Sequence, residues 1–200
     1  MSRRRIIQSQ IGELPKLPNG YVRCKYLESS GKQCINSQIM ACDIGEVRIT
    51  FAVIRYIDTH SVYKLNGIYG INNMLSDVKL WFNNSANSFS FIFNSQPVAD
   101  YTDIELYKIY KLSASGTKSS YKGTIALFAV FDSNPNKVMF YSACRIYHFC
   151  IPDIANLIPA IRKSDNKPGM YNTVSNLFST NIGTGEFGYE LMDGTYVAPV

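Results

Sequence analysis

Residues 78–93 read VKLWFNNSANSFSFIF, two short runs of alternating residues on either side of a polar turn. In the first run Val78, Leu80 and Phe82 fall on one side of an extended chain, and in 88–93 every second residue is phenylalanine. Period-two alternation is typical of β-strands that have one face on a core and the other in water. The Asn83-Asn84 step between the runs is a common turn signal. The stretch therefore predicts two half-buried strands.

The same pattern extends outward from this stretch. Residues 47–53 alternate apolar and polar side chains, whereas TIALFAVF (124–131) is apolar on both faces and predicts a central strand or one beneath a loop. Residues 100–112 favour strand over helix, because β-branched and aromatic residues dominate them. PDIANLI (152–158) is compatible with one short helical turn. We therefore expect an all-β fold, a two-sheet antiparallel β-sandwich of ten or more strands in a jelly-roll or concanavalin-like form.

The length of 200 residues fits one such domain. Pro15 and Pro18 disfavour regular structure near the start, so we predict an N-terminal arm or linker over residues 1–20. The sandwich domain is expected over 21–188, and a C-terminal tail over 189–200.

The net charge of +5 includes three adjacent positive residues, Arg3, Arg4 and Arg5. The remainder is only mildly basic, so nucleic-acid binding is unlikely and a partner-anchoring arm is favoured. Ile6-Ile7 is too short for the apolar region of a signal peptide, and no stretch approaches the length of a membrane span. We therefore expect synthesis in a cytoplasm and no membrane partner.

The five cysteines argue against a complete set of intrachain disulfides, because their number is odd. Cys144 and Cys150 are expected on one straight strand, too far apart to pair. The chain has no Cys-x-x-Cys spacing, and His60 and His148 have no partner at a ligand interval. We therefore expect core thiols, no metal site and no cofactor.

The carboxylates do not suggest catalysis. Only Asp103 and Glu105 are expected to share a strand face, whereas a glycosidase needs two carboxylates facing each other across a groove. Gly183-Thr184-Gly185 has no helix after it, so it is interpreted as a turn that feeds the closing strand rather than a phosphate loop. Asp132-Ser133-Asn134 and Asp165-Asn166 are oxygen-rich turns, but the same residues are preferred in ordinary turns, so calcium is disfavoured. The sequence predicts a protein that is not an enzyme.

A sugar platform is the strongest candidate for a ligand site. Trp81 is expected to point outward from its strand, and Asn83 and Asn84 follow it. Sandwich lectins stack a sugar on an aromatic ring and bond its hydroxyl groups through amide side chains. The alternative is a tryptophan that packs under a loop or against the other sheet. Further aromatic residues that could contribute are Tyr63, Tyr69 and Tyr121.

Two terminal segments carry a resemblance to a known family. Residues 18–37 read PNGYVRCKYLESSGKQCINS, and residues 141–187 read YSACRIYHFCIPDIANLIPAIRKSDNKPGMYNTVSNLFSTNIGTGEF. In order, spacing and residue type they resemble the two ends of a concanavalin-A-like or laminin-G-like sandwich module of gut-bacterial tailed-phage and prophage structural proteins. Cys34 departs from the pattern, where an aromatic residue is usual, and Met170 stands where leucine is usual. Residues that match the pattern are Tyr21, Tyr26, Glu28, Ser29, Gly31, Arg145, Ile146, Tyr147, Pro159, Tyr171 and Gly185.

This resemblance implies a non-enzymatic virion protein made in a bacterial cytoplasm, as head decoration, head fibre or tail component. Its partners are expected to be other virion proteins, with a second copy of the chain and a cell-surface glycan as further candidates. The arm and the tail are the expected anchors. The alternatives are a carbohydrate-binding adhesin module and a secreted host lectin, of which the missing signal peptide disfavours the second.

Overall fold

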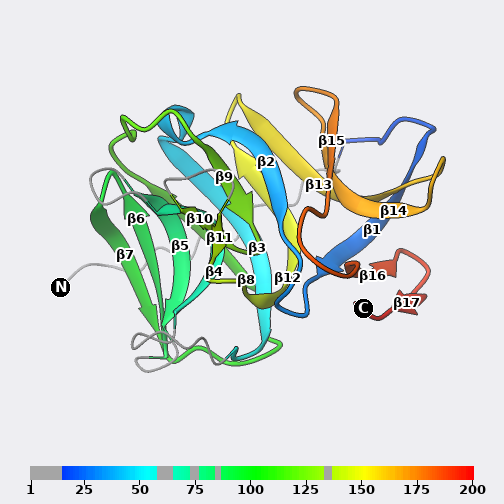
Figure 1. Ribbon diagram of the computed structural model, residues 1–200, viewed down its shortest axis with the longest axis horizontal. Coiled ribbons are helices and arrows are strands. Elements are labelled where there is room, and N and C mark those ends of the chain that lie inside the picture. The colour runs from blue at the N-terminus through cyan, green and yellow to red at the C-terminus, as the bar shows by residue number, and fades with distance from the viewer. Residues whose placement is uncertain (1–14, 58–64, 73–76, 84–86, 133–136) are drawn as a thin grey trace.

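Two β-sheets pack face to face over one apolar core (Figure 1). The computed structural model describes residues 15–57, 65–72, 77–83, 87–132 and 137–200. In this part of the chain the only helical element is the short 3-10 turn η1 (Ala41–Asp43). None of the described helices is long and apolar enough to cross a membrane. The all-β two-sheet sandwich predicted from the sequence is confirmed.

The larger sheet has nine strands in the order β15-β14-β13-β1-β12-β3-β8, and β16 adds to β1 while β17 adds to β16. Strand β16, near the end of the chain, thus lies beside the N-terminal strand β1. The strands are β1 (Tyr21–Glu28), β3 (Glu46–Arg55), β8 (Tyr110–Ser115), β12 (Ala143–Ile151), β13 (Ala155–Arg162), β14 (Lys167–Asn172), β15 (Leu177–Thr180), β16 (Gly188–Leu191) and β17 (Tyr196–Val197).

The smaller sheet has eight strands, ordered β11-β10-β4-β5-β6-β7, with β9 joining β4 to β2. The prediction of antiparallel strands holds for every described pairing except β10 with β4, which is parallel. The strands are β2 (Ile35–Met40), β4 (Leu65–Asn72), β5 (Val78–Asn83), β6 (Ser88–Phe93), β7 (Gln96–Thr102), β9 (Thr124–Leu127), β10 (Val130–Asp132) and β11 (Val138–Met139).

The alternating runs form strands with the predicted buried faces. Val78, Leu80 and Phe82 on β5 are buried, and so are the three phenylalanines of β6. The backbones of Asn94 and Ser95 both have positive φ, which suits the tight turn that joins β6 to β7. The alternation thus fixes the inward face, and the turn residues allow the hairpin.

Two expected strands are interrupted in the structure. The run 124–131 is buried as predicted, but Phe128 has a φ of +65° and divides it into β9 and β10. Residues 100–112 do not form one strand, because β7 ends at Thr102 and a loop over 103–109 leads to β8. The turn expected within 152–158 precedes β13, which begins at Ala155, and it contains no helix.

The predicted domain boundaries are partly changed. The first strand begins at Tyr21, where the sandwich was expected to start. The tail expected over 189–200 instead contributes β16 and β17, with Tyr189 and Glu190 paired to β1. The side chains of Tyr196 and Val197 on β17 remain exposed. Residues 1–14, including Arg3–Arg5, lie outside the described part of the chain.

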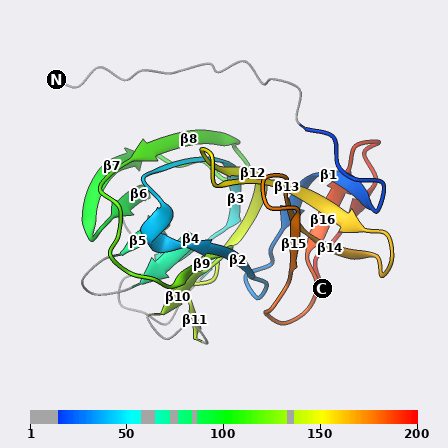
Figure 2. The same cartoon turned by 90° about the horizontal axis from the view of Figure 1, so that it is seen from above.

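The molecule has two halves along its long axis (Figure 2). We call strands β2–β12 the sandwich half, which closes around the apolar core. We call β1 and β13–β17 the terminal half, which lies beside it and joins it through the pairings of β12 with β1 and β13. The two segments that carry the family resemblance form most of the terminal half.

Candidate contact surface

Trp81 lies half-buried on the outer face of β5, on the opposite side from Leu80 and Phe82. The ammonium group of Lys79 lies 4.0 Å from the centre of its ring. Lys79 is buried and forms an ion pair with Asp77. Burial lowers the pKa of Lys79, because desolvation disfavours the ammonium form, and Asp77 opposes this shift. The predicted outward direction of Trp81 is therefore found, but its ring already has a cationic neighbour.

The other residues of the predicted sugar platform do not form a single group with Trp81. Asn83 is half-buried on β5, two residues beyond Trp81 and on the same face. Asn84 and Tyr63 lie outside the described residues. Tyr69 cannot contribute, because it is buried in the core and packs against Phe149 with 5.1 Å between ring centres. The inclusion of Tyr69 in the platform was wrong. Both faces of β4 are covered at this point, because Ile68 and Tyr69 are both buried.

The candidate catalytic groups occupy structural positions. Asp103 and Glu105 lie in the loop after β7 and not on one strand face, which corrects the expectation from the sequence. Glu105 forms an ion pair with Lys108. The Nε2 atom of His148 lies 2.5 Å from Oδ1 of Asn156. Over the described ranges, no three His, Cys, Asp or Glu side chains come together as a metal site; His60 lies outside them.

All five cysteines are free thiols. Cys24, Cys34 and Cys144 are buried, and burial raises the pKa of Cys34 to about 11 and those of the other two to about 12. A thiol with a raised pKa holds little thiolate near neutral pH, so it is a poor nucleophile. These cysteines are therefore core residues, as the sequence suggested.

The residues that carry the family resemblance build a polar link between the two halves. Glu28 is buried, and its carboxylate accepts hydrogen bonds from Arg145 at 2.6 Å and from the Tyr196 hydroxyl at 2.8 Å. The guanidinium group of Arg145 also lies 4.4 Å from the ring centre of Tyr26. A buried carboxylate with two such donors is satisfied as a structural group. The resemblance therefore falls on packing residues, not on an exposed site.

A stronger candidate for a contact surface than Trp81 lies where the two sheets end. We call residues 96–116, which comprise β7, the loop 103–109 and β8, the β7–β8 edge. Strand β8 is the last strand of the larger sheet and β7 the last of the smaller sheet. The loop between them is fixed at two points, because the Tyr107 amide donates to the Val53 carbonyl at 2.7 Å and the Glu105 amide donates to the Tyr110 hydroxyl at 2.7 Å. The backbone of Tyr107 has a φ of +63°, which is unusual for a bulky residue.

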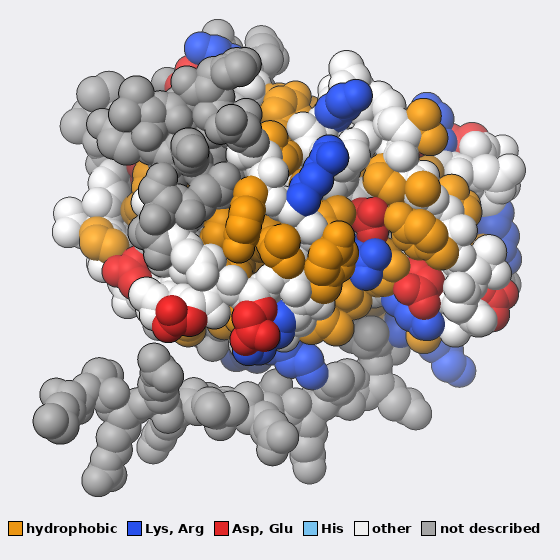
Figure 3. All heavy atoms as spheres, turned by 90° about the horizontal axis from the view of Figure 1, so that it is seen from below, with side chains coloured by type: hydrophobic (Ala, Val, Ile, Leu, Met, Phe, Trp, Pro, Cys, Tyr) orange, Lys and Arg blue, Asp and Glu red, His pale blue; other side chains and the backbone are white. Residues whose placement is uncertain are grey.

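The loop 103–109 exposes three large apolar side chains to solvent. Leu106 is 37% exposed, Tyr107 64% and Ile109 51%. The exposed Tyr56 belongs to the same end of the sandwich, since it stacks on Phe82 and its hydroxyl lies 3.4 Å from the side-chain amide of Asn87. Figure 3, which views the molecule from below, shows hydrophobic side chains over the middle of its surface, with acidic groups both at its lower left edge and among the basic groups on the right.

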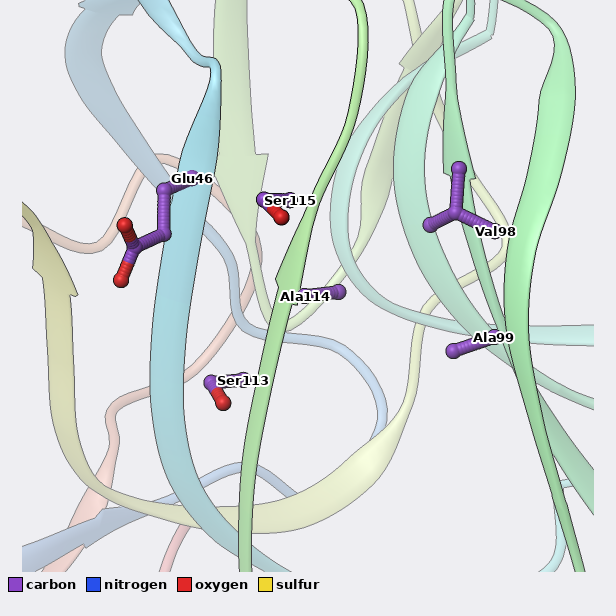
Figure 4. A pocket seen from close by; sticks show the side chains of 6 residues that line it. All are labelled: Glu46, Val98, Ala99, Ser113, Ala114 and Ser115. Carbon is purple, nitrogen blue, oxygen red and sulfur yellow. The ribbon is translucent and has the colours of Figure 1, made fainter. Parts of the chain in front are cut away.

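Beside the loop, a hollow of about 280 Å³ lies between the two edge strands. In Figure 4 the side chain of Ala114 points toward Val98 and Ala99 across the hollow. Ala99 and Ala114 are small, so the space between the sheets is left open at this point. The hollow is lined by Glu46, Val98, Ala99, Ser113, Ala114 and Ser115.

Sequence reasoning missed the β7–β8 edge. Residues 100–112 contain no glycine or proline, and their β-branched and aromatic residues favoured a continuous strand. Asp103 was the available signal, because aspartate tolerates positive φ and is common in turns. No comparable signal in the sequence distinguishes exposed Ile109 from buried Ile104.

Comparisons of this chain with protein-family models, with curated proteins and with solved structures gave no match.

Proposed function

We propose that the chain is a non-enzymatic structural component of a phage particle, a β-sandwich that is fastened to other virion proteins by protein–protein contacts. The resemblance of the segments 18–37 and 141–187 to phage structural proteins supports this proposal. The observation that carries it is the loop 103–109, which presents three large apolar side chains on a fixed backbone. Head decoration, head fibre and tail component are all compatible with such a loop.

The loop has the physical properties of a contact element. Apolar groups that leave water on contact contribute favourable free energy, and a backbone that is already ordered loses little entropy when it binds. Tyr107 combines both properties, because its ring is exposed while its amide is bonded to Val53. An unusual φ that is held by its surroundings is characteristic of functional sites.

The arm over residues 1–20 is the second anchor in this proposal. The tail, whose strands β16 and β17 pair within the chain, keeps exposed side chains such as Met192 and Val200 and stays an anchor in this proposal. The arm carries Arg3, Arg4 and Arg5, which suit an acidic surface on a partner.

The test uses particles purified from a culture that makes the chain naturally. We expect the chain to sediment with the particles, and a Tyr107→Ser, Ile109→Ser double variant to remain in the supernatant. Val174→Ser is the matched control, because Val174 is an exposed apolar residue of the terminal half, and it should incorporate normally. A chain lacking residues 2–14 should stay folded and soluble but fail to incorporate. Normal incorporation of the loop variant, or absence of the wild-type chain from particles, contradicts the proposal.

The second candidate is an adhesin module that binds a host-surface glycan. The half-buried Trp81 with Asn83 on the same face of β5 favours it. A glycan array separates the two candidates: binding that Trp81→Ala abolishes supports the adhesin. An array without signal, together with chain in the particles, supports the structural role.

A further inference from the structure

The two strands of the β7–β8 edge each have an open side. In an antiparallel pair, every second residue directs its backbone N–H and C=O away from its neighbour. Strand β8 pairs with β3 on one side, and β7 pairs with β6 on one side. Within the described part of the chain no strand pairs with the other side of either one. Such open edges accept an added strand from another chain.

The hollow between these edges has the form of a short groove. At one end the two edges come together, since a Cβ on Gly116 would lie 3.2 Å from Cγ1 of Val98 on β7. At the other end the ring of Tyr101 packs on Phe91, with 6.1 Å between ring centres. Between these ends Ala99 and Ala114 leave the space open (Figure 4). The groove therefore has room for small side chains in its middle.

The loop end of the groove is the more acidic one. Glu46 lines the groove near its other end, but it is paired with Arg48. Asp100 on the outer face of β7 and Asp103 at the start of the loop are exposed, and neither forms an ion pair with a described residue. Glu105 lies at the same end, although Lys108 pairs with it. A segment with positive charge at one end would be oriented by these carboxylates.

The chain contains a segment of matching sequence that lies outside the structure. Residues 3–11 read RRRIIQSQI, without glycine or proline, and Ile7, Ser9 and Ile11 share one face if the segment is extended. Ser9 is the small residue that the middle of the groove requires. At about 3.3 Å per residue, residues 1–14 reach on the order of 46 Å. Strands β1 and β7 lie toward opposite ends of the long axis (Figures 1 and 2), so the segment of the same molecule must span its length to reach β7, whereas a second copy is free of this constraint.

We infer that the groove of the β7–β8 edge binds residues 3–11 of a second copy of this chain as an added strand, antiparallel to β7, with Arg3–Arg5 at the acidic end. This inference rests on the proposed role of the arm as an anchor and names the surface that receives it. Copies joined in this way form a head-to-tail contact, which closes into a ring or extends along a particle surface.

The test uses the full chain with a photo-reactive phenylalanine analogue at position 9. An unlabelled chain that carries the analogue is mixed with an isotopically heavy chain that lacks it. After irradiation, we expect cross-linked peptides that join light position 9 to heavy residues 96–102. Val98→Arg places bulk and like charge in the groove and should reduce this cross-link about tenfold, a loss equivalent to about 1.4 kcal/mol. Val174→Arg is the control in the terminal half and should leave the cross-link unchanged.

Cross-links that map elsewhere, or that join position 9 only to its own chain, overturn the inference. So does a Val98→Arg variant that is folded by circular dichroism and cross-links as the wild type does. The proposed function fails separately: if the cross-link forms but the chain lacking residues 2–14 enters particles normally, the arm is not the anchor. If the arm is needed for incorporation but cross-links miss β7, only the groove assignment is wrong.

Discussion

The larger sheet runs through both the sandwich half and the terminal half, yet different forces hold the two halves. In the sandwich half, aromatic rings fill the space between the two sheets: the fully buried Phe89 contacts Phe51 and the half-buried Tyr110 of the opposite sheet and Phe82 of its own, with ring centres 4.8–5.4 Å apart. The hydrophobic effect that favours this packing is non-directional, and its free energy scales with the apolar area removed from water. No single polar contact decides whether this half closes.

The terminal half relies on directional contacts instead. Glu28 joins β1 to Arg145 of β12 and to Tyr196 of β17. The side chain of Gln33 donates a hydrogen bond to the Val200 carbonyl at 3.0 Å, and Glu186 exchanges two backbone hydrogen bonds with Val200. Each of these contacts has one donor and one acceptor, so the loss of either leaves the other without its partner, and the cost is largest at the buried Glu28.

The comparison shows that one fold can combine non-directional apolar packing in one half with strand contacts in the other half that depend on specific polar pairs. Apolar packing makes the sandwich half stable, whereas the polar contacts select which strand lies beside β1. We therefore expect the two halves to respond differently to substitution and to pH.

The largest effect is expected in the sandwich half. Phe89→Ala removes a fully buried ring and leaves a cavity, which should lower the free energy of unfolding by about 3–5 kcal/mol. Urea denaturation followed by fluorescence measures this loss. The matched control, Phe178→Ala, removes a half-buried ring of the terminal half and should cost clearly less. Equal losses at the two positions would contradict the division into halves.

The next effect tests the polar link. Glu28→Ala leaves Arg145 without its carboxylate partner, and the cost should be about 2–3 kcal/mol because the pair is largely but not fully buried. Glu46→Ala removes the partner of Arg48 in an exposed pair on the larger sheet and should cost about 0–1 kcal/mol. If the two variants unfold at the same urea concentration, Glu28 does not hold the halves together.

A smaller effect is expected where the chain end packs. Gly185 has a φ of +72°, and an added Cβ would lie 1.8 Å from the Val200 carbonyl oxygen. Gly185→Ala should therefore cost about 1–2 kcal/mol. Gly20→Ala, where no atom lies within 4 Å of the added Cβ, should be near neutral. Hydrogen exchange should show faster exchange at β16 in the first variant, and unchanged exchange there would show that Val200 moves freely.

The smallest effect concerns pH. The ammonium group of Lys25 holds the pKa of Glu190 below its usual value, with help from the Tyr26 hydroxyl. The folded pKa is then lower than the unfolded pKa of about 4.3, so the stabilisation is complete above that pH and is lost as pH falls through the folded pKa. Exchange at β16, corrected for intrinsic rates, should accelerate as pH falls below about 4.3, while exchange at β5 stays constant. Glu190→Gln should remove this dependence, and its persistence in that variant would exclude Glu190 as the cause.

The sequence predicted the fold class and the buried faces of individual strands well. The phenylalanines of β6 and the alternating residues of β3 and β5 lie inward as expected, because period two is a local property of an extended chain. It did not predict the break at Phe128 or the loop at Tyr107, because no glycine or proline marks those positive φ values. Of the predicted sugar platform, Trp81 and Asn83 share a face of β5. Tyr69 does not belong to it, because the sequence did not reveal which tyrosines the second sheet covers.

The amino-acid order alone determined that this chain is built from half-buried strands and that most of its cysteines belong to the core. Only the tertiary structure decided which strands are neighbours and which side chains are exposed to solvent. It brings Arg145 to Glu28 across 117 residues and leaves β7 and β8 at the ends of their sheets. The physical reason is that side-chain alternation depends on adjacent residues, whereas strand order depends on the packing of the whole chain.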